Sequence, residues 1–214
     1  MDRYDRELMA AWLRGSLGDV PELRESGEET LLEAARQAGL KPYVFKQQDQ
    51  LPRVRAVLGF LHGVQPESLL DVGSGRGVFL FPFLREFPEV PVTSLDLLPK
   101  RVEMLQTISR GGYGRLTALR QDICAWDAPA GSFDVVTLLE VLEHIPDAAA
   151  AVRNAVRLAG RYVVVSVPSK PDTNPEHIHL FSKAALTDMF REAGCGDLRF
   201  GGVNGHLLLT AHLK

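Results

Sequence analysis

Short apolar runs recur along the chain from residue 69 onward, and segments with helical spacing separate several of them. Five runs have the length and composition of buried strands: 69–72, 92–95, 116–121, 133–139 and 161–167, the last stopped by Pro168. The alternating segments 198–203 and 206–211 flank Asn204-Gly205, a pair typical of a two-residue hairpin. The pattern therefore predicts a doubly wound α/β sheet, mostly parallel, that a C-terminal hairpin closes with one antiparallel strand.

Helices are expected between and after these strands. The alanine-rich segment 147–159 leads from the fourth strand to the fifth, and Ser182 caps a helix over 183–193 that Gly194 ends. No helix is expected between the third and fourth strands, because 124–132 is short and rich in Pro, Gly and Asp.

The residues before the sheet have amphipathic, helical spacing. Ser26 and Glu29 form a capping box that predicts a helix over 30–38. Pro52 opens a further helix, whose apolar positions are Val54, Val57, Leu58 and Leu61. We therefore predict two parts in one globular unit, a helical part over 1–62 and a sheet-bearing domain over 63–214.

Composition narrows the possible partners. With 214 residues and 45% hydrophobic content the chain can bury one full core, and its net charge of −3 offers no basic surface for a nucleic acid. No apolar run approaches the length of a membrane span, and the charged start lacks the core of a signal peptide. Cys124 and Cys195 are interpreted as free thiols of a reducing compartment, so we expect a cytoplasmic protein without membrane contact.

The most informative motif joins the first strand to a glycine-rich turn, Asp71-Val72-Gly73-Ser74-Gly75-Arg76-Gly77. Glycines let a chain bend sharply and let a ligand lie against bare backbone amides. A dinucleotide fingerprint requires its third small residue at the place of Val78, whereas Gly77 comes one residue earlier. A buried carboxylate at Asp71 would repel a pyrophosphate but suits a ligand that carries an ammonium and a sulfonium group.

This turn resembles motif I of the class I, Rossmann-like methyltransferases that depend on S-adenosylmethionine, and the chain resembles uncharacterised bacterial members of the small-molecule type. The resemblance covers about residue 67 to the C-terminus and implies a seven-stranded sheet, S-adenosylmethionine as the cofactor and a small molecule as the methyl acceptor. It implies cofactor binding by Asp71, Gly73, Ser74, Gly75, Gly77, Asp96, Leu97, Asp122, Ile123 and Glu140.

Two of these residues follow strands in the expected order. Asp96 comes about 20 residues after the glycine turn, where an acid meets the ribose hydroxyls in adenosine-binding folds. Asp122-Ile123 resembles the family's adenine clamp, in which a carboxylate binds the exocyclic amine and an apolar residue lies against the ring.

The segment Glu140-Val141-Leu142-Glu143-His144 resembles the stretch after the fourth strand that reaches the methyl group in small-molecule methyltransferases. A hydroxyl acceptor usually needs its proton removed, and His144, assisted by Glu140 or Glu143, is the candidate base. The alternative is that His144 only hydrogen-bonds the loop after Pro168, which is long, rich in proline and the expected substrate loop.

A rival interpretation uses the same segment for a metal ion. On one helical face, Glu140, Glu143 and His144 could join His177 and His179, a set that resembles the metal site of small-RNA 2′-O-methyltransferases. The short gap before His177 and the lack of a basic stripe depart from that family, so no metal is the main expectation. A non-catalytic adenosyl-binding module is the third hypothesis. The helices of 1–62 are expected either to form a lid over the cofactor or to cover one sheet edge.

Overall fold

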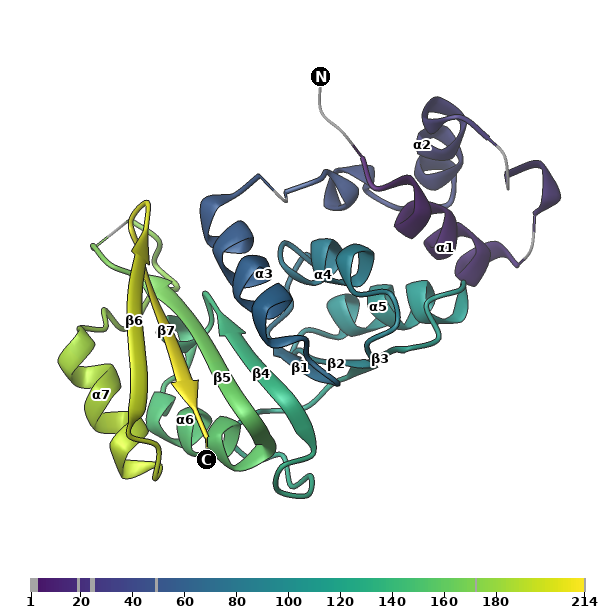
Figure 1. The fold of residues 1–214 in the computed structure, drawn as a ribbon. Coiled ribbons are helices and arrows are strands. Elements are labelled where there is room, and N and C mark those ends of the chain that lie inside the picture. Colours follow the sequence, from purple (N-terminus) through teal and green to yellow (C-terminus); the bar gives the residue numbers. More distant parts are fainter. Residues whose placement is uncertain (1–3, 19, 24–25, 49, 172, 214) are drawn as a thin grey trace.

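The computed structural model describes residues 4–18, 20–23, 26–48, 50–171 and 173–213. Residues 1–3, at the start of the predicted helical part, and residue 214, at the end of the predicted sheet-bearing domain, lie outside the described residues. Its strands are β1 Leu69–Val72, β2 Val92–Leu95, β3 Leu116–Leu119, β4 Phe133–Leu139, β5 Ala159–Pro168, β6 Asp197–Val203 and β7 His206–His212. They form one sheet in the order β3-β2-β1-β4-β5-β7-β6, in which β7 runs antiparallel to both neighbours. The predicted seven-stranded, doubly wound α/β sheet with a closing hairpin is confirmed (Figure 1).

The helices are α1 Arg6–Leu17, α2 Glu28–Gln37, α3 Pro52–Val64, α4 Leu80–Glu86, α5 Pro99–Arg110, α6 Ala148–Leu158 and α7 Lys183–Glu192, with 3-10 turns η1 Pro21–Leu23, η2 Pro42–Phe45 and η3 Leu142–His144. The connection from β3 to β4 holds no helix, as the sequence predicts. Ser182 caps α7 by accepting a hydrogen bond from Ala185 N, which confirms the expected start of that helix.

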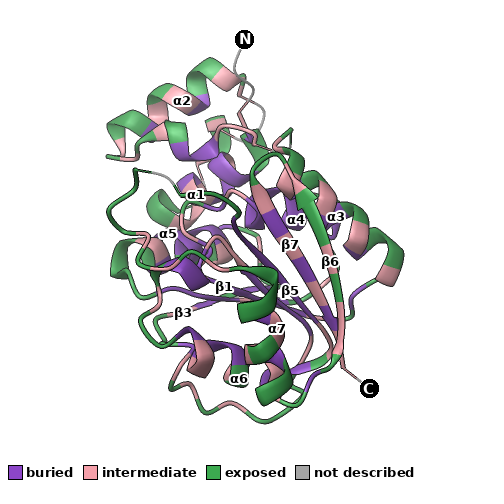
Figure 2. Ribbon diagram, turned by 90° about the vertical axis from the view of Figure 1, so that its left-hand side faces the viewer, coloured by how far each residue is buried: buried purple, intermediate pink, exposed green. Residues whose placement is uncertain are grey.

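Helices cover both faces of the sheet, and each face has its own buried cluster. Alternate strand residues such as Leu69 and Val135 pack with α1, α3, α4 and α5, while their neighbours Leu70 and Val136 pack with α6 and α7. Figure 2 shows the central strands buried, with the outward sides of α6 and α7 exposed. This layering leaves the carboxyl ends of the parallel strands as an edge where loops can build a site.

Three predicted boundaries are wrong. The strand expected over 161–167 begins at Ala159 and includes Pro168, which pairs with His206 although proline has no N–H to donate. The third strand ends at Leu119 rather than at residue 121. The capping box is also wrong, because α2 begins at Glu28 after Gly27, and the Ser26 hydroxyl donates to the Glu22 carbonyl.

The N-terminal helix α1 packs closely on α5 through two glycines. A Cβ atom on Gly111 would lie 1.6 Å from the Ala11 carbonyl oxygen, and one on Gly15 would lie 1.9 Å from the Thr107 carbonyl oxygen. The backbones therefore touch at a point where no larger residue fits. Figure 1 shows α1 and α2 beyond α5, at the β3 end of the molecule, whereas α3 lies nearer β4 and β5.

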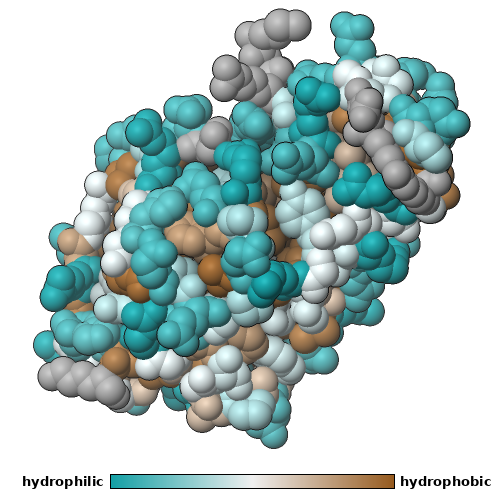
Figure 3. Space-filling model, turned by 45° about the vertical axis from the view of Figure 1, so that its right-hand side comes forward, coloured by the Kyte–Doolittle hydropathy of each residue, from teal (hydrophilic) through white to brown (hydrophobic). Residues whose placement is uncertain are grey.

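Among the residues that the structure describes, no helix is both long and apolar enough to cross a bilayer. On the face drawn in Figure 3, hydrophobic residues form small areas among hydrophilic ones. Cys124 and Cys195 are free thiols.

Candidate functional site

The glycine-rich turn follows β1 at the carboxyl edge of the sheet. Gly73 has a left-handed backbone with φ of 67°, and a Cβ atom there would lie 2.6 Å from Cγ2 of Val141. Gly77 has φ of 79°, and a Cβ atom on it would lie 2.6 Å from the ring of Phe81. Glycine is therefore required at both positions, by conformation and by space. The helix after the turn, α4, begins at Leu80.

Asp71 is buried under this turn and held by hydroxyl groups. Its carboxylate accepts hydrogen bonds from the Ser74 hydroxyl at 2.5 Å and from the Thr137 hydroxyl at 2.7 Å. The Ser94 hydroxyl lies 2.7 Å from that of Ser74. Burial raises the pKa of Asp71 to about 6, with a smaller contribution from the charge of Asp96, while the two hydroxyls oppose the rise. A cation beside Asp71 would favour its charged form.

Asp96 directly follows β2, and Asp122 comes three residues after the end of β3 at the same edge of the sheet. The Asp96 carboxylate accepts from Gly75 N at 3.0 Å and from Leu98 N at 2.9 Å, so it also ties the glycine turn to β2. The Asp122 carboxylate accepts from Cys124 N at 2.9 Å. Burial, followed by the charge of Asp122, raises the pKa of Cys124 to about 11, so this thiol is neutral and unsuited to act as a nucleophile.

Two hollows meet at the glycine turn. The larger, a cleft of about 730 Å³, is lined by Asp96, Leu97, Asp122, Ile123 and His144 among others. The smaller, of about 190 Å³, is lined by Asp71, Ser74, Ser166 and the start of α3, including Arg53. Both share Gly73, Gly75, Arg76 and Glu140. Nine of the ten predicted cofactor residues thus line these hollows, and Gly77 lies in the turn behind them.

A third hollow, of about 790 Å³, lies at the opposite edge of the sheet among α1, α4 and the segment before β3. Its walls carry four arginines and two glutamates, and it contains none of the predicted site residues. The ends of the strands that carry the glycine turn and the acids do not reach it, so we assign the site to the two joined hollows.

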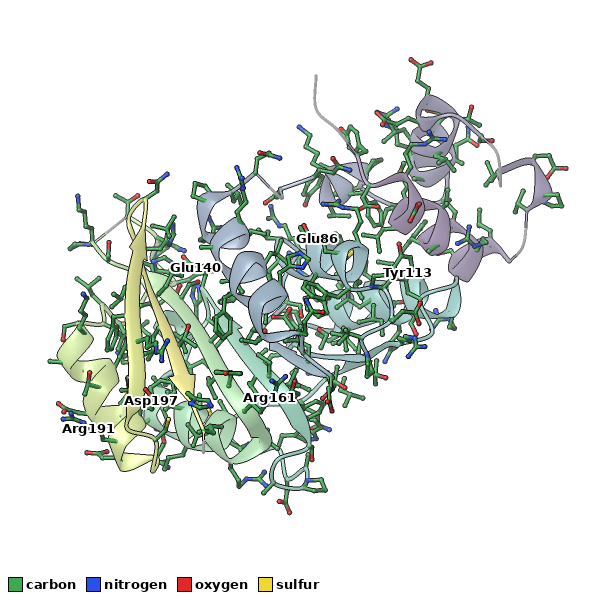
Figure 4. All side chains as sticks on the ribbon, viewed as in Figure 1. Glu86, Tyr113, Glu140, Arg161, Arg191 and Asp197 are labelled. Carbon is green, nitrogen blue, oxygen red and sulfur yellow. The ribbon has the colours of Figure 1, made fainter. Side chains whose placement is uncertain are left out.

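Glu140 stands where these two hollows join, at the end of β4. Its backbone is left-handed, with φ of 57°, which is uncommon for a residue with a side chain. Oε1 accepts from the Ser166 hydroxyl at 2.6 Å, and Oε2 lies 2.9 Å from Nδ1 of His206. In Figure 4, Glu140 is labelled at the end of the sheet near the start of α3.

His144 points toward the long loop instead. Its Nδ1 lies 2.9 Å from the Glu176 carbonyl oxygen, and its ring centre lies 4.8 Å from that of His177. The loop is also joined to η3 by backbone bonds, since the amides of Ile178 and His179 both donate to the Glu143 carbonyl. The predicted contact of His144 with the loop is therefore present, and His144 still lines the cleft.

The five-ligand metal set is not assembled. The expectation that Glu140, Glu143 and His144 share one helical face is wrong, because only Leu142–His144 form a turn and Glu140 lies before it in a left-handed conformation. His179 bonds through Nε2 to the Ile145 carbonyl at 3.1 Å. Of the described residues, Glu143, His144 and His177 have possible ligand atoms within 4.8 Å of one another.

The cleft is acidic. Its walls carry five carboxyl side chains, those of Asp96, Asp122, Glu140, Asp147 and Glu176, and two guanidinium groups, those of Arg76 and Arg101. Such a lining attracts a cationic ligand and repels a polyanion such as an RNA backbone.

Comparison with known sequences decides the family. A sequence model of the family described as "Methyltransferase domain" matches residues 43–198, most of the chain. The chain belongs to this methyltransferase family. The predicted class I, small-molecule type of S-adenosylmethionine-dependent methyltransferase is confirmed at the level of the family.

Curated relatives of this methyltransferase include the ubiquinone biosynthesis O-methyltransferase of Vibrio campbellii, 33% identical over 107 residues that make up 50% of this chain and 45% of that protein. The enzyme of the same name from Paracidovorax citrulli is 35% identical over 107 residues, 47% of this chain and 44% of that protein. The chain therefore spans less than half the length of these two relatives.

Solved structures share the fold. An O-methyltransferase family protein from Burkholderia thailandensis aligns with a TM-score of 0.64 at 20% identity, over 89% of this chain and 62% of that one. The magnesium protoporphyrin IX methyltransferase of Synechocystis PCC 6803, solved with bound S-adenosylhomocysteine, aligns with a TM-score of 0.60 at 20% identity, over 76% and 82%. At 20% identity, these similarities show that the fold is shared and carry no statement about activity.

Several residues of the site were missed by the sequence reasoning. Ser94 and Thr137 stand as polar residues inside apolar strands, a signal that could have pointed to a buried partner such as Asp71. Ser166 and His206 gave no local signal, because they reach Glu140 only through the pairing of β5 and β7. Arg53, in the first turn of α3, lines the smaller hollow and was also not predicted.

Proposed function

We propose that this chain transfers a methyl group from S-adenosylmethionine to a small-molecule acceptor. The observation that carries the proposal is the pair of joined hollows, one with a buried carboxylate and two arginines, the other with strand-end acids and an apolar wall. Membership of the methyltransferase family supports it, and so do the names of the relatives, which describe O-methyltransferases. Because those relatives are named O-methyltransferases, we propose that the acceptor atom is a hydroxyl oxygen.

The amino-acid end of the cofactor fits the smaller hollow. Asp71 would meet the ammonium group, and the guanidinium groups of Arg53 and Arg76 would meet the carboxylate. The adenosine fits the larger cleft, with Asp96 at the ribose hydroxyls and Asp122 and Ile123 at the adenine. Glu140, which lines both hollows, would then border the place where the two ends of the cofactor join.

When bound, S-adenosylmethionine supplies a methyl group already activated for transfer. The chain's own residues hold the acceptor in line with that group and exclude water. The loop 173–181, joined to η3 by the amides of Ile178 and His179, closes one side of the cleft and is the proposed acceptor loop. His144 lies under it, with Nδ1 engaged by the Glu176 carbonyl.

Replacement of Asp96 by alanine should weaken binding of S-adenosylhomocysteine about 30-fold or more, because charge-assisted hydrogen bonds contribute about 1.5–3 kcal/mol each. The change also removes the acceptor for Gly75 N and Leu98 N, so the turn itself loosens. Isothermal titration measures the affinity. Asp188→Ala on α7, outside both hollows, is the control and should leave the affinity unchanged. Equal affinities in wild type and Asp96→Ala would contradict the adenosine assignment.

Affinity for S-adenosylhomocysteine should fall as pH drops below about 6. In the free protein the raised pKa of Asp71, about 6, keeps this carboxyl partly protonated below that pH, and an ammonium partner requires the charged form. One proton released on binding gives a slope of up to about tenfold in Kd per pH unit. Titrations from pH 5 to 8 measure it, and Asp71→Asn should flatten the dependence. A wild-type Kd that stays constant over this range would refute the ammonium contact.

The activity itself is tested with S-adenosylmethionine that carries a radiolabelled methyl group and with small-molecule fractions of a bacterial extract. Label should appear in a low-molecular-mass product and not in RNA. Tight binding of S-adenosylhomocysteine without transfer to any fraction would favour the non-catalytic module. The acidic cleft and the position of Glu140 both weigh against the RNA alternative.

A further inference from the structure

Glu140 is the one carboxylate that lines both hollows, and two strands hold it there. Ser166, near the end of β5, donates its hydroxyl to Oε1, and its carbonyl accepts from the Glu140 amide at 2.9 Å. His206, the first residue of β7, lies with Nδ1 2.9 Å from Oε2, at ion-pair distance but without the alignment of a hydrogen bond. Both carboxylate oxygens keep at least one lone pair for a ligand.

The position of His206 is fixed by the hairpin. The turn Asn204-Gly205 has φ values of 41° and 88°, and it sets the register in which His206 lies opposite Pro168 of β5. The side chains of Glu140 and His206 are 23% and 24% exposed, so both are mostly buried, and Glu140 is the one of the two that lines the hollows. Left-handed backbone at a residue with a side chain costs about 1 kcal/mol or more and tends to occur at functional sites.

We infer that Glu140 takes the proton that leaves a hydroxyl acceptor, and that His206 positions Glu140 by lying at ion-pair distance from Oε2. The inference rests on the proposed function. The acceptor oxygen forms a bond to the methyl carbon, the carbon–sulfur bond breaks with its electron pair going to sulfur, and the hydroxyl proton moves to the Glu140 carboxylate.

This assignment differs from the base expected from the sequence. His144 has its Nδ1 engaged by the Glu176 carbonyl and lies on the loop side of the cleft, whereas Glu140 stands where the two hollows join. Glu140 is therefore the catalytic residue of the pair, and His206 is its positioning residue.

The chain contains a matched pair for control. His212, at the other end of β7, lies with Nδ1 3.1 Å from Oδ2 of Asp197, with exposures of 42% and 39% for the two side chains. It is also a histidine within ion-pair distance of a carboxylate on the same strand, here with hydrogen-bond alignment, and Asp197 lines neither hollow whereas Glu140 lines both. Any general effect of changing a histidine in the hairpin should appear in both positions.

The test compares His206→Asn with His212→Asn. An asparagine amide can place a nitrogen near the position of Nδ1, but it cannot become a cation beside Oε2 as an imidazole can. Initial rates are measured with radiolabelled methyl donor and the extract fraction that wild type labels fastest. We expect His206→Asn to lose about tenfold or more of the rate, within the range of general acid–base effects, and Glu140→Gln to lose at least as much. His212→Asn should stay within about twofold of wild type.

Affinity for S-adenosylhomocysteine and thermal stability separate this role from others. Both should be unchanged in His206→Asn, within about threefold for Kd. The inference is overturned if His206→Asn keeps more than half of the rate, if both asparagine variants lose rate equally, or if Kd rises in parallel with the loss. A wild type that binds no S-adenosylhomocysteine and labels no fraction would instead refute the proposed function, before any variant is compared.

Discussion

Replacement of Gly73 by valine should weaken binding of S-adenosylhomocysteine about a hundredfold or more. The backbone at Gly73 has φ of 67°, a region that a β-branched residue rarely adopts, and the new Cβ would lie 2.6 Å from Cγ2 of Val141. Left-handed strain of about 1–2 kcal/mol and overpacking of about 1–3 kcal/mol push the free turn out of its binding conformation, and restoring that conformation on binding costs a free energy that corresponds to this factor. Isothermal titration with folded protein measures it.

Gly131→Val is the matched control for this change. Gly131 also has a left-handed φ, 65°, but nothing lies within 4 Å of a Cβ atom placed there, and it is remote from both hollows, in the connection before β4. The control carries the same kind of backbone strain, so we expect it to lower stability slightly and leave affinity unchanged. If Gly73→Val bound as tightly as Gly131→Val, the glycine turn would not be the ligand site.

Replacement of Gly111 by alanine should lower the free energy of unfolding by about 3 kcal/mol, at the upper end of overpacking costs. The added Cβ would meet two backbone atoms, the Ala11 carbonyl oxygen at 1.6 Å and its carbon at 2.6 Å. Backbone cannot turn aside as a flexible side chain does, so α1 must move away from α5. Urea denaturation measures the loss, and limited proteolysis should cut α1 sooner than in wild type.

Gly63→Ala in α3 is the control for stability, because nothing lies within 4 Å of its Cβ position. Alanine there should stabilise the protein by up to about 1 kcal/mol, the usual gain over glycine within a helix. A Gly111→Ala protein as stable as wild type would mean that the contact between α1 and α5 is looser than described.

The same variant tests what the N-terminal helices do. The linings of the two hollows include residues of α3 but none of α1 or α2. We therefore propose that α1 and α2 cover the β3 side of the molecule and that α3 alone borders the cofactor. Affinity for S-adenosylhomocysteine should stay within about threefold in Gly111→Ala, since no lining residue is changed. A large loss of affinity would instead support a lid.

The sequence predicts the sheet well because its signals are local. A buried parallel strand such as β4 is a continuous apolar run, and Asn204-Gly205 defines the hairpin without reference to the rest of the chain. The order of glycines and acids at strand ends is equally local, since each such residue follows its own strand. The positions of Asp71, Asp96 and Asp122 around the two hollows therefore match the sequence-based expectation.

What the sequence missed depends on contacts between distant segments. Spacing places Glu140 with Glu143 and His144, but a helical face requires helical backbone at all three, and Glu140 has φ of 57°. Its actual partners, Ser166 and His206, are 26 and 66 residues away and reach it only through strand pairing. The failed capping box has a similar cause, since Ser26 bonds the carbonyl of Glu22 rather than the start of α2.

The place of β7 in the sheet also governs when the protein becomes competent during synthesis. The ribosome produces the glycine turn and Asp96 more than a hundred residues before it produces β7, which inserts between β5 and β6. A nascent chain that has emerged only as far as β5 has the carboxylate of Glu140 but lacks His206. Pairing of Glu140 with His206 must therefore await the synthesis of β7, even where the parallel strands have already assembled.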